Sequence, residues 1–277
     1  CFGSAQHPTK SLSHKVPKSK ILNVPKSLSQ NSLKVTTMNI SVISTAQQCQ
    51  DFDFSGKVAV VIDVLRATSV IITALANGAR SVIPVLTVEE AEKCFSACNA
   101  ASTLKGGERN SVRIDGFDLG NSPLEYKRSV VAGKDIVFTT TNGTQALRGV
   151  QGADEIVLAC FRNMASVADY LLRLQKDVVI VCSGTHGRFS LDDGLCAGRL
   201  VGLLKKQAKV EIDDLSILLS NHYDNSKDNL FGALAGCFHV KFLFGLGFYD
   251  DIRFCLQTDC DDVVPTLKDG KCVLINQ

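Results

Sequence analysis

The sequence predicts an α/β protein, a three-layer α/β/α sandwich around a mixed, largely parallel sheet. From about residue 39 onward, short apolar runs alternate with amphipathic stretches, which is the pattern of strands and helices that pack in layers. The chain has 277 residues, of which 45% are hydrophobic and 21% charged, so it can bury the core of one large or two small domains.

Six short apolar runs are predicted to be strands, at residues 58–62, 81–85, 103–105, 135–139, 155–160 and 177–182. The amphipathic stretches between and after them are predicted to be helices, at residues 68–77, 88–98, 123–131, 143–149, 163–175 and 192–207. Three of these helices have a capping residue directly before them: Thr87, Ser122 followed by Pro123, and Asn163. The alternation of the two element types is what predicts the layered class.

The region after residue 210 has weaker signals. The segment SNHYDNSKDN is predicted to be a polar loop or a helix cap. The apolar segments VKFLFGLGF, DIRFCLQ and KCVLI are predicted to be late strands or a small C-terminal cap.

The first 37 residues differ in composition from the rest of the chain. They are rich in Ser and Lys, lack acidic residues and have no periodic apolar face, so we predict a disordered leader. This bias is typical of an organelle transit peptide, and the absence of Arg favours a plastid over a mitochondrion. Met38 could equally begin the compact domain, predicted to span 38–277 as one unit or two closely packed α/β halves. We expect a soluble protein of the plastid or the cytoplasm.

The distribution of charge and the length of the apolar runs argue against a nucleic-acid-binding protein and against a membrane-spanning one. All six basic residues among the first 50 are Lys, and the remaining 24 basic residues are outnumbered by 28 acidic ones. The folded part is therefore acidic, which argues against a nucleic-acid-binding protein. Polar, charged or glycine residues interrupt every apolar run before the roughly 20 residues that a membrane span needs.

The eleven cysteines do not form the pattern of a disulfide scaffold or a zinc site. They are spread along the chain, and several lie inside apolar runs, where small buried thiols are common. Cys94 and Cys98 have the spacing of one helix face, and only three His follow residue 50. A reducing compartment and no structural zinc are therefore expected.

Polar residues follow four predicted strands at the point where each strand ends. Asp63 and Arg66 follow VAVVI, and Glu108 and Arg109 follow the strand at 103–105. The hydroxyl-rich segment TTTNGT at 139–144 and the segment Ser-Gly-Thr at 183–185 end two more strands. Because ligands of open α/β sheets bind at the carboxyl ends of the strands, we expect these groups to meet at one edge.

The segment TTTNGT combines hydroxyl groups with a flexible Asn-Gly turn before a predicted helix. Free amides and the positive end of the helix dipole attract anions, so the segment favours binding of phosphate or sulfonate. A capped helix start after a tight turn explains the same residues, and both interpretations stay open. The Ser-Gly-Thr segment has the same two interpretations.

More acidic residues lie near these strand ends than structural ion pairs would need. Hard oxygen ligands with few histidines suit Mg²⁺, which keeps several waters and bridges to a substrate phosphate. Arginine side chains suit anionic groups, because a guanidinium binds phosphate, sulfonate or carboxylate through two hydrogen bonds. A structural ion pair between Asp63 and Arg66 is the alternative. The glycine-rich loop GFDLGNSP, with Asp118 and Asn121, is expected either to close over a ligand or to be an ordinary connection.

Eight ordered motifs carry a resemblance to a known family: DVLRATS, ALANGA, GGER, GFDLGNSP, TTTNGT, FRNMASVA, CSGTHGRFSLDDGLCAG and DIRFCLQTDCDDVVP. In this order they resemble the 2-phosphosulfolactate phosphatase family, over residues from about 39 to 277. The resemblance implies an α/β/α fold and an Mg²⁺-dependent phosphatase of coenzyme M biosynthesis. It implies hydrolysis of the phosphate monoester of a small anionic hydroxy acid, (R)-2-phospho-3-sulfolactate, to (R)-3-sulfolactate and phosphate. The transit-like leader leaves a related phosphorylated sulfonate or hydroxy acid open as the substrate.

Within the matched motifs, residue chemistry predicts three roles. The predicted metal ligands are Asp63, Glu108 and Asp193. The predicted substrate-binding residues are Arg66, Arg109, Asn121, Thr140, Thr141, Asn142, Gly143, Thr144 and Ser183. The predicted catalytic residue is Asp118 or Asp192, which would orient the attacking water or protonate the leaving alkoxide. The family often has Glu-Asp where Asp192 and Asp193 stand.

Other functions stay open at this point. Cys182 and Arg188 have the spacing of cysteine-dependent phosphatases, in which a thiolate attacks phosphorus. The segment DFDFS resembles the aspartyl nucleophile motif of haloacid dehalogenase-like phosphatases, but no apolar strand precedes it, so a loop is predicted. A non-catalytic anion-binding module and a homo-oligomer are further alternatives. His186, His222 and His239 are predicted to be ordinary polar groups rather than catalytic acids.

Overall fold

The computed structural model describes residues 37–275. The predicted leader, residues 1–37, therefore lies outside the described residues except for its last position. The described strands are β1 (Met38–Ile43), β2 (Val58–Ile62), β3 (Ser81–Pro84), β4 (Thr103–Arg109), β5 (Val112–Arg113), β6 (Asp135–Thr139), β7 (Glu155–Ala159), β8 (Val178–Cys182), β9 (Val210–Ile212), β10 (Pro265–Lys268) and β11 (Lys271–Leu274). The described α-helices are α1 (Ala67–Ala76), α2 (Val88–Ser96), α3 (Arg128–Val131), α4 (Gly143–Gly149), α5 (Met164–Leu174), α6 (Leu191–Gln207), α7 (Asp214–Ser226), α8 (Leu230–Leu234), α9 (Phe238–Gly245) and α10 (Tyr249–Cys255).

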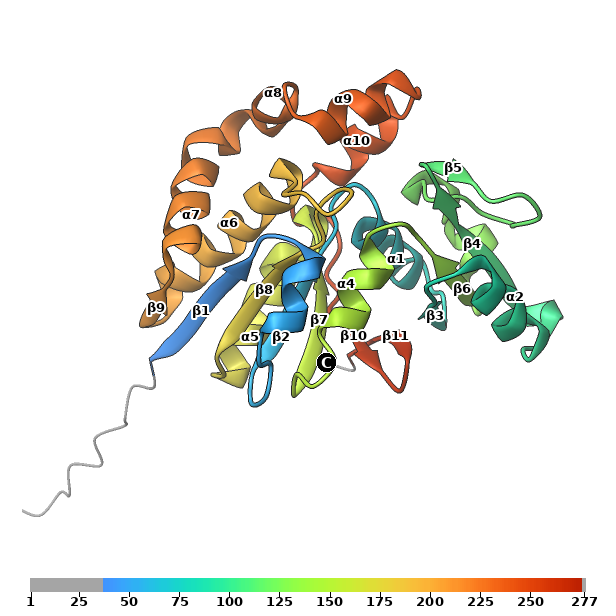
Figure 1. Cartoon of the computed structure of the whole chain (residues 1–277), viewed down its shortest axis with the longest axis horizontal. Coiled ribbons are helices and arrows are strands. Elements are labelled where there is room, and N and C mark those ends of the chain that lie inside the picture. Colours follow the sequence, from blue (N-terminus) through green and yellow to red (C-terminus); the bar gives the residue numbers. More distant parts are fainter. Residues whose placement is uncertain (1–36, 276–277) are drawn as a thin grey trace, which may run out of the picture. The chain divides into compact units, whose positions relative to one another are not determined.

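The strands form one mixed sheet in the order β5-β4-β6-β3-β11-β10-β7-β2-β8-β1-β9. Strands β7, β2, β8, β1 and β9 are parallel to one another, and so are β4, β6 and β3. The C-terminal hairpin β10–β11 pairs antiparallel with β7 on one side and β3 on the other. It therefore joins two parallel groups of strands into a continuous sheet (Figure 1).

Helices cover both faces of the sheet, and the alternation within β2 shows how. Val58, Val60 and Ile62 pack into a core with α5, α6 and α7, whereas Ala59 and Val61 pack into a second core with α1 and α4. Every side chain of β2 is apolar because this central strand is buried on both faces, as strands of parallel sheets usually are. The predicted three-layer α/β/α sandwich with a mixed, largely parallel sheet is confirmed.

Most predicted elements are confirmed within one or two residues, and β2, β6 and α4 have the predicted bounds. The predicted strand at 103–105 continues to Arg109, and the predicted helix at 123–131 is a 3₁₀ turn (Pro123–Glu125) followed by the one-turn helix α3. SNHYDNSKDN lies in the end of α7 and the 3₁₀ turn Lys227–Asn229 after it. The expectation of strands in VKFLFGLGF and DIRFCLQ was wrong, because these segments form α9 and α10.

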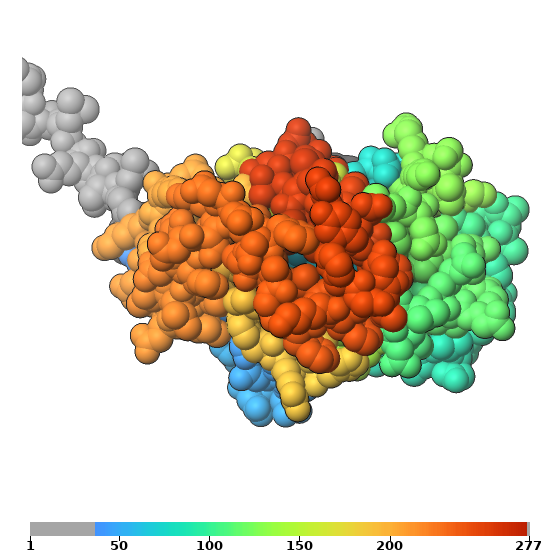
Figure 2. Space-filling view, turned by 90° about the horizontal axis from the view of Figure 1, so that it is seen from above, coloured from blue at the N-terminus to red at the C-terminus, as the bar shows by residue number. Residues whose placement is uncertain are grey.

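Helices α8, α9 and α10 form a cap over the carboxyl ends of the central strands; we call them the cap helices. Figure 1 shows them above the sheet edge, and Figure 2 shows them in orange and red, surrounding a small opening. No helix within residues 37–275 is both long and apolar enough to cross a membrane. The ten cysteines of this part of the chain are all free thiols, and five of the six buried ones lie in the two main cores around β2.

Candidate active site

A cavity opens at the carboxyl edge of the sheet, beneath the cap. Its walls come from the loops after β2, β4, β6 and β8 and from α9, so segments far apart in the chain meet there. The enclosed part of the cavity measures about 30 Å³, and its mouth is open to solvent. Its lining residues are Asp63, Leu65, Arg66, Glu108, Asn110, Ser111, Asn121, Thr140, Thr141, Asn142, Thr185, His186, His239 and Phe242.

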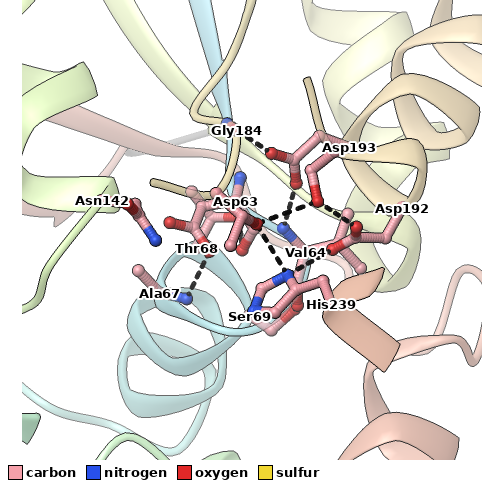
Figure 3. Close-up of polar contacts among 12 residues, drawn as sticks. Asp63, Val64, Ala67, Thr68, Ser69, Asn142, Gly184, Asp192, Asp193 and His239 are labelled. Carbon is pink, nitrogen blue, oxygen red and sulfur yellow. Dashed lines mark hydrogen bonds and ion pairs between the residues drawn. The ribbon is translucent and has the colours of Figure 1, made fainter. Parts of the chain in front are cut away.

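Asp63 directly follows β2 and lines the cavity, and Figure 3 shows it among Ala67, Asp193 and His239. Its Oδ1 accepts a hydrogen bond of 3.0 Å from the backbone N–H of Ala67, the first residue of α1. Burial raises the pKa of Asp63 to about 6, and the negative charges of Asp192 and Glu108 add to the increase. Because the charged form is costly there, a cation near Asp63 would stabilise it.

Gly143, the first residue of α4, permits a close approach to Asp63. A Cβ atom at this position would lie 2.4 Å from the Cβ of Ala67 and 2.8 Å from Oδ2 of Asp63. The amino ends of α1 and α4 therefore meet beside this carboxylate, which explains why the Asn-Gly sequence of TTTNGT is used here.

Glu108 joins two loops of the cavity wall. Its Oε1 accepts a hydrogen bond of 2.8 Å from the backbone N–H of Thr141, and its Oε2 accepts one of 2.6 Å from that of Ser111. The carboxylate is buried and lines the cavity. Two charge-assisted bonds hold it in one orientation, as a preorganised ligand requires.

Arg66 is held by the cap. Its Nη1 forms a 2.5 Å ion pair with Oδ2 of Asp251 in α10, and its guanidinium lies 3.8 Å from the centre of the Phe248 ring. Nη2 donates a hydrogen bond of 3.2 Å to the backbone carbonyl of Ser111, and Asp251 also accepts one from the hydroxyl of Ser122. The sequence-level alternative, an ion pair between Asp63 and Arg66, does not occur; Arg66 pairs with Asp251 while still lining the cavity.

His239 is the residue whose importance the sequence did not reveal. It is the second residue of α9, it lines the cavity, and its Nδ1 lies 3.4 Å from Oδ2 of Asp192 (Figure 3). Nδ1 also lies 3.1 Å from the hydroxyl of Thr185, which contacts the hydroxyl of Ser190, and Ser190 donates a hydrogen bond to Oδ1 of Asp192. Since a carboxylate only accepts hydrogen bonds, this series of hydrogen bonds has one consistent direction, from Nδ1–H of His239 through the two hydroxyls to Asp192.

The charges of this pair stabilise each other. Burial lowers the pKa of His239, but the negative charge of Asp192 and their hydrogen bond outweigh it and raise this pKa above its ordinary value. Burial raises the pKa of Asp192, but His239 and Ser190 outweigh it and lower this pKa. Both shifts favour the charged form of the side chain, and the pair is buried next to the cavity. Asp192 itself is not a lining residue, so its contact with a ligand would run through His239.

Asp193 is turned away from the cavity. Its Oδ1 accepts a hydrogen bond of 2.8 Å from the backbone N–H of Val64, and its Oδ2 accepts one of 3.0 Å from that of Gly184. Burial raises its pKa well above the ordinary value, with contributions from the charges of Asp192 and Asp63. Asp193 thus ties α6 to the ends of β2 and β8.

The predicted metal set of Asp63, Glu108 and Asp193 is consequently not assembled. In the part of the chain that the structure describes, no group of three or more His, Cys, Asp or Glu side chains could hold a metal ion. Two of the three predicted ligands, Asp63 and Glu108, nevertheless line one cavity.

The predicted substrate-binding residues divide into two groups. Thr140, Thr141, Asn142 and Asn121 line the cavity with Arg66, and the buried atoms Oδ1 of Asn121 and Oγ1 of Thr141 have no hydrogen-bond partner. The other predicted residues lie behind this wall. Thr144 donates its hydroxyl hydrogen to the backbone carbonyl of Thr140, Gly143 contacts Asp63, and the buried hydroxyl of Ser183 has no partner.

Arg109 and Asp118 are not brought to the cavity. The guanidinium of Arg109 donates hydrogen bonds to the carbonyls of Glu108 and Leu86 and to the hydroxyl of Thr139. Asp118 is exposed and accepts a hydrogen bond of 2.8 Å from the backbone N–H of Lys105. Both side chains stabilise the strand β4 region, so the geometry does not favour their predicted binding and catalytic roles.

The geometry also weakens the rival mechanisms. Cys182 is fully buried in the core, and burial raises its pKa well above the ordinary value, so it would not be a thiolate. Arg188 is exposed, and the segment DFDFS is mainly a loop in which Phe54 is buried and Asp53 is fully exposed. His222 is exposed on α7 and lines no part of this cavity.

Together, fold and site define an α/β protein with a small polar cavity at the sheet edge. The cavity offers carboxylates, a buried arginine and a histidine paired with a buried aspartate beneath a helical cap. Residues 43–270 match the profile of the 2-phosphosulpholactate phosphatase family, and the chain belongs to this family.

Curated relatives agree with this family. A protein of Caldanaerobacter subterraneus subsp. tengcongensis, named "Probable 2-phosphosulfolactate phosphatase", is 48% identical over 84% of this chain and 97% of its own length. Proteins of Clostridium novyi and Clostridium perfringens with the same name are 42% and 43% identical, over 82% and 84% of this chain and 96% and 95% of theirs. The resemblance found in the motifs is thereby confirmed.

The residues around the cavity fit a magnesium ion by the chemistry of their oxygen atoms. Mg²⁺ in enzymes uses one or two carboxylates, several waters and substrate phosphate rather than an all-protein cage. Asp63 and Glu108 supply two carboxylates, and the unpartnered oxygens of Asn121 and Thr141 add neutral ligands. Asp193 does not belong to this set, because it does not line the cavity.

Proposed function

We propose that this chain is an Mg²⁺-dependent phosphatase that hydrolyses the phosphate monoester of a small anionic hydroxy acid. The names of its curated relatives support 2-phosphosulfolactate as the substrate, with sulfolactate and phosphate as the products, and we propose the (R) enantiomer. The single observation that carries the reaction type is the charged pair of His239 and Asp192 beside a cavity that also holds Arg66. An acid and an anion-binding group in one cavity are what monoester hydrolysis needs.

Arg66 would bind the phosphoryl oxygens, since its guanidinium is preset by Asp251 and Phe248. His239 would be the general acid. Its Nδ1 is engaged by Thr185 and Asp192, which leaves Nε2 to deliver a proton to the leaving alkoxide. Asp192 is then a positioning residue that keeps the imidazole charged and oriented, rather than the residue that touches the substrate.

Asp63 and Glu108 would hold Mg²⁺, which when bound neutralises phosphoryl oxygens and lowers the pKa of its water. The hydroxyls of Thr140 and Thr141 and the amides of Asn121 and Asn142 would orient the remaining anionic groups of the substrate. The unpartnered oxygen of Asn121 is a polar atom that a bound ligand or ion would satisfy.

Phosphate release tests this proposal. Purified protein is assayed with phosphosulfolactate and related phosphorylated hydroxy acids, in Mg²⁺, in chelator, and after thiol alkylation. We expect turnover that is lost in chelator and restored by Mg²⁺ but insensitive to alkylation. Stoichiometric binding without phosphate release would instead identify a non-catalytic anion-binding module, and loss upon alkylation alone would favour the Cys182 mechanism.

The role of His239 has its own test. His239→Gln should lower kcat for an alkyl phosphate by about 10²–10⁴-fold, the usual contribution of a general acid. With p-nitrophenyl phosphate, whose leaving group needs no proton, the loss should be much smaller. Equal losses for both substrates would show that His239 acts in binding or folding and not as the acid.

A further inference from the structure

A second cavity adjoins the one that contains Arg66 and His239, which we call the catalytic cavity. Thr185, His186 and His239 line both, and the second cavity has further walls from the loop after β8 and the start of α9. It measures about 370 Å³, against about 30 Å³ for the enclosed part of the catalytic cavity. In Figure 2 the loop after β8, in gold, lies next to the cap helices. The two cavities therefore meet at three shared residues.

The enclosed part of the catalytic cavity is too small for a whole molecule with three anionic groups. About 30 Å³ is room for roughly two water molecules. The proposed function places the phosphoryl group beside Arg66 and the leaving oxygen beside His239, so the organic part of the substrate extends from His239. The second cavity begins at that residue and has the space that the catalytic cavity lacks.

The charge of the second cavity is opposite to that of the catalytic one. Asp63 and Glu108 line the catalytic cavity, whereas no Asp or Glu of the described residues lines the second one. Arg188 does line it. Within residues 37–275 this exposed arginine has no side-chain partner, whereas the guanidinium of Arg66 is paired with Asp251. The second cavity therefore holds a positive charge that is available to an anionic group.

Two further features of the second cavity favour an anion beside Arg188. Cys237, Phe238 and His239 line it at the amino end of α9, which is the positive end of the helix dipole. Phe189 and Phe238 are apolar walls, which hold water away from one side of the guanidinium. Opposite charges attract each other more strongly where less water surrounds them.

We propose that the second cavity binds the sulfonate of the substrate and that Arg188 is the residue that selects for it. The inference rests on the proposed phosphatase function and deepens it by giving one anionic group a site of its own. The sulfonate is the group that reaches this site, because it is one bond farther from the leaving oxygen than the carboxylate is. A guanidinium binds three-oxygen anions through two parallel hydrogen bonds. The carboxylate then stays with the hydroxyls and amides of the catalytic cavity.

The test compares three substrates that differ only in the group on C3: 2-phosphosulfolactate with a sulfonate, 2-phosphomalate with a carboxylate, and 2-phospholactate with hydrogen. Phosphate release from each is measured in the full chain with Mg²⁺. We expect kcat/KM to be highest with the sulfonate and lowest with hydrogen. In Arg188→Ala, kcat/KM for the sulfonate should fall by about 10–100-fold, the usual range for a hydrogen bond to a charged group. The loss should lie mainly in KM, because Arg188 is remote from the reacting atoms, and kcat/KM for 2-phospholactate should stay unchanged.

Two variants are the controls. Arg148→Ala removes an exposed arginine of α4 that lines neither cavity, so it should leave all three substrates unchanged. Arg188→Lys keeps the charge but loses the two parallel hydrogen bonds, so its loss for the sulfonate should be smaller than that of Arg188→Ala. Because Arg188 is exposed, the Tm of its variants should match that of the wild type, which separates a binding defect from a folding defect.

Three outcomes would overturn the inference. Equal losses for all three substrates in Arg188→Ala would show that Arg188 acts on the phosphoryl group or the carboxylate. An undiminished preference for the sulfonate in Arg188→Ala would place the sulfonate elsewhere. In both cases phosphate is still released, so the proposed function stands. No release from any of the three substrates by the wild type would instead defeat the proposed function, and the inference with it.

Discussion

Replacing Asp192 with Asn removes one charge and almost no volume. Asp192 is buried, and the pair it forms with His239 is also shielded from solvent, with side chains 1% and 11% exposed. Opposite unit charges 3.4 Å apart attract each other by roughly 5 kcal/mol at an effective dielectric constant of about 20. An amide dipole and entering water would recover part of this energy, so we expect a loss of about 1.4–3 kcal/mol in transition-state stabilisation, or 10–150-fold in kcat.

The pH dependence of this effect follows from the direction in which the pKa of His239 is shifted. The pKa of His239 lies above its ordinary value because the charge and hydrogen bond of Asp192 outweigh burial. Its ion pair therefore stabilises the fold fully below the unfolded-state pKa and is lost as the pH rises through the folded-state pKa. Without Asp192, burial dominates and the pKa falls below the ordinary value. The basic limb of the rate profile should therefore move to lower pH, and the loss in kcat should be larger at pH 8 than at pH 6.

The assay is kcat and kcat/KM for one alkyl phosphate from pH 5 to 9, with urea unfolding at pH 6 and pH 8 on the same samples. Asp169→Asn, which changes an exposed acid of α5, is the matched control and should leave the profile in place. A uniform fall in kcat at all pH values, with the basic limb unmoved, would refute the assignment of His239 as an acid set by Asp192.

Three further predictions concern other parts of the molecule. Cys182→Ser should keep most of the phosphatase activity, measured as phosphate release, because this thiol is buried and uncharged. Gly198→Ala should lower the free energy of unfolding, measured in urea, by about 1–3 kcal/mol, because its Cβ would lie 2.1 Å from the carbonyl oxygen of Leu219 in α7. Gly202→Ala is the control on the same helix: no atom lies within 4 Å of its added Cβ, so it should be neutral or stabilising by up to about 1 kcal/mol. Mg²⁺ at 100 times its Kd should raise the Tm of the wild type by about 5–10 °C and that of Asp63→Asn much less, in differential scanning fluorimetry.

The central strands were predictable because burial on both faces leaves an unmistakable apolar run. β2 is VAVVI and β8 is VVIVC, and nothing but a buried strand suits such short β-branched segments between turn residues. β1 was missed although MNISVI alternates apolar and polar residues, the pattern of a half-buried strand. β10 was missed because PTLK is short and polar. For VKFLFGLGF the sequence left a late strand and a small C-terminal cap open, because a short aromatic run has no clear period; most of the segment lies in α9, one of the cap helices.

The sequence predicted which strand ends form the site, but not which side chains at those ends face the cavity. The rule that parallel strands deliver their carboxyl ends to one edge correctly brought Asp63, Glu108 and Thr140 together. It could not say which of two neighbours points inward. Side chains alternate along a strand, so when Glu108 lines the cavity Arg109 points to the other face.

The same limit applies to the first turn of α6. Consecutive helical residues are about 100° apart, so Asp192 faces His239 while Asp193 faces the backbone of Val64 and Gly184. His239 was beyond prediction for a different reason. It lies 47 positions after Asp192 in a segment of uncertain secondary structure, and no local pattern links the two residues.

The balance of charge in the cavity supports the proposal that an anionic substrate binds together with a divalent cation. Asp63 and Glu108 are carboxylates, whereas the positive charge of Arg66 is already matched by Asp251 and that of His239 by Asp192. An anion that entered alone would meet unbalanced negative charge in a poorly solvated space. The raised pKa of Asp63 has the same cause: burial raises it, and the charges of Asp192 and Glu108 raise it further. A divalent cation held by these two carboxylates would cancel that negative charge, so the proposed function predicts that the cation binds first and the substrate second.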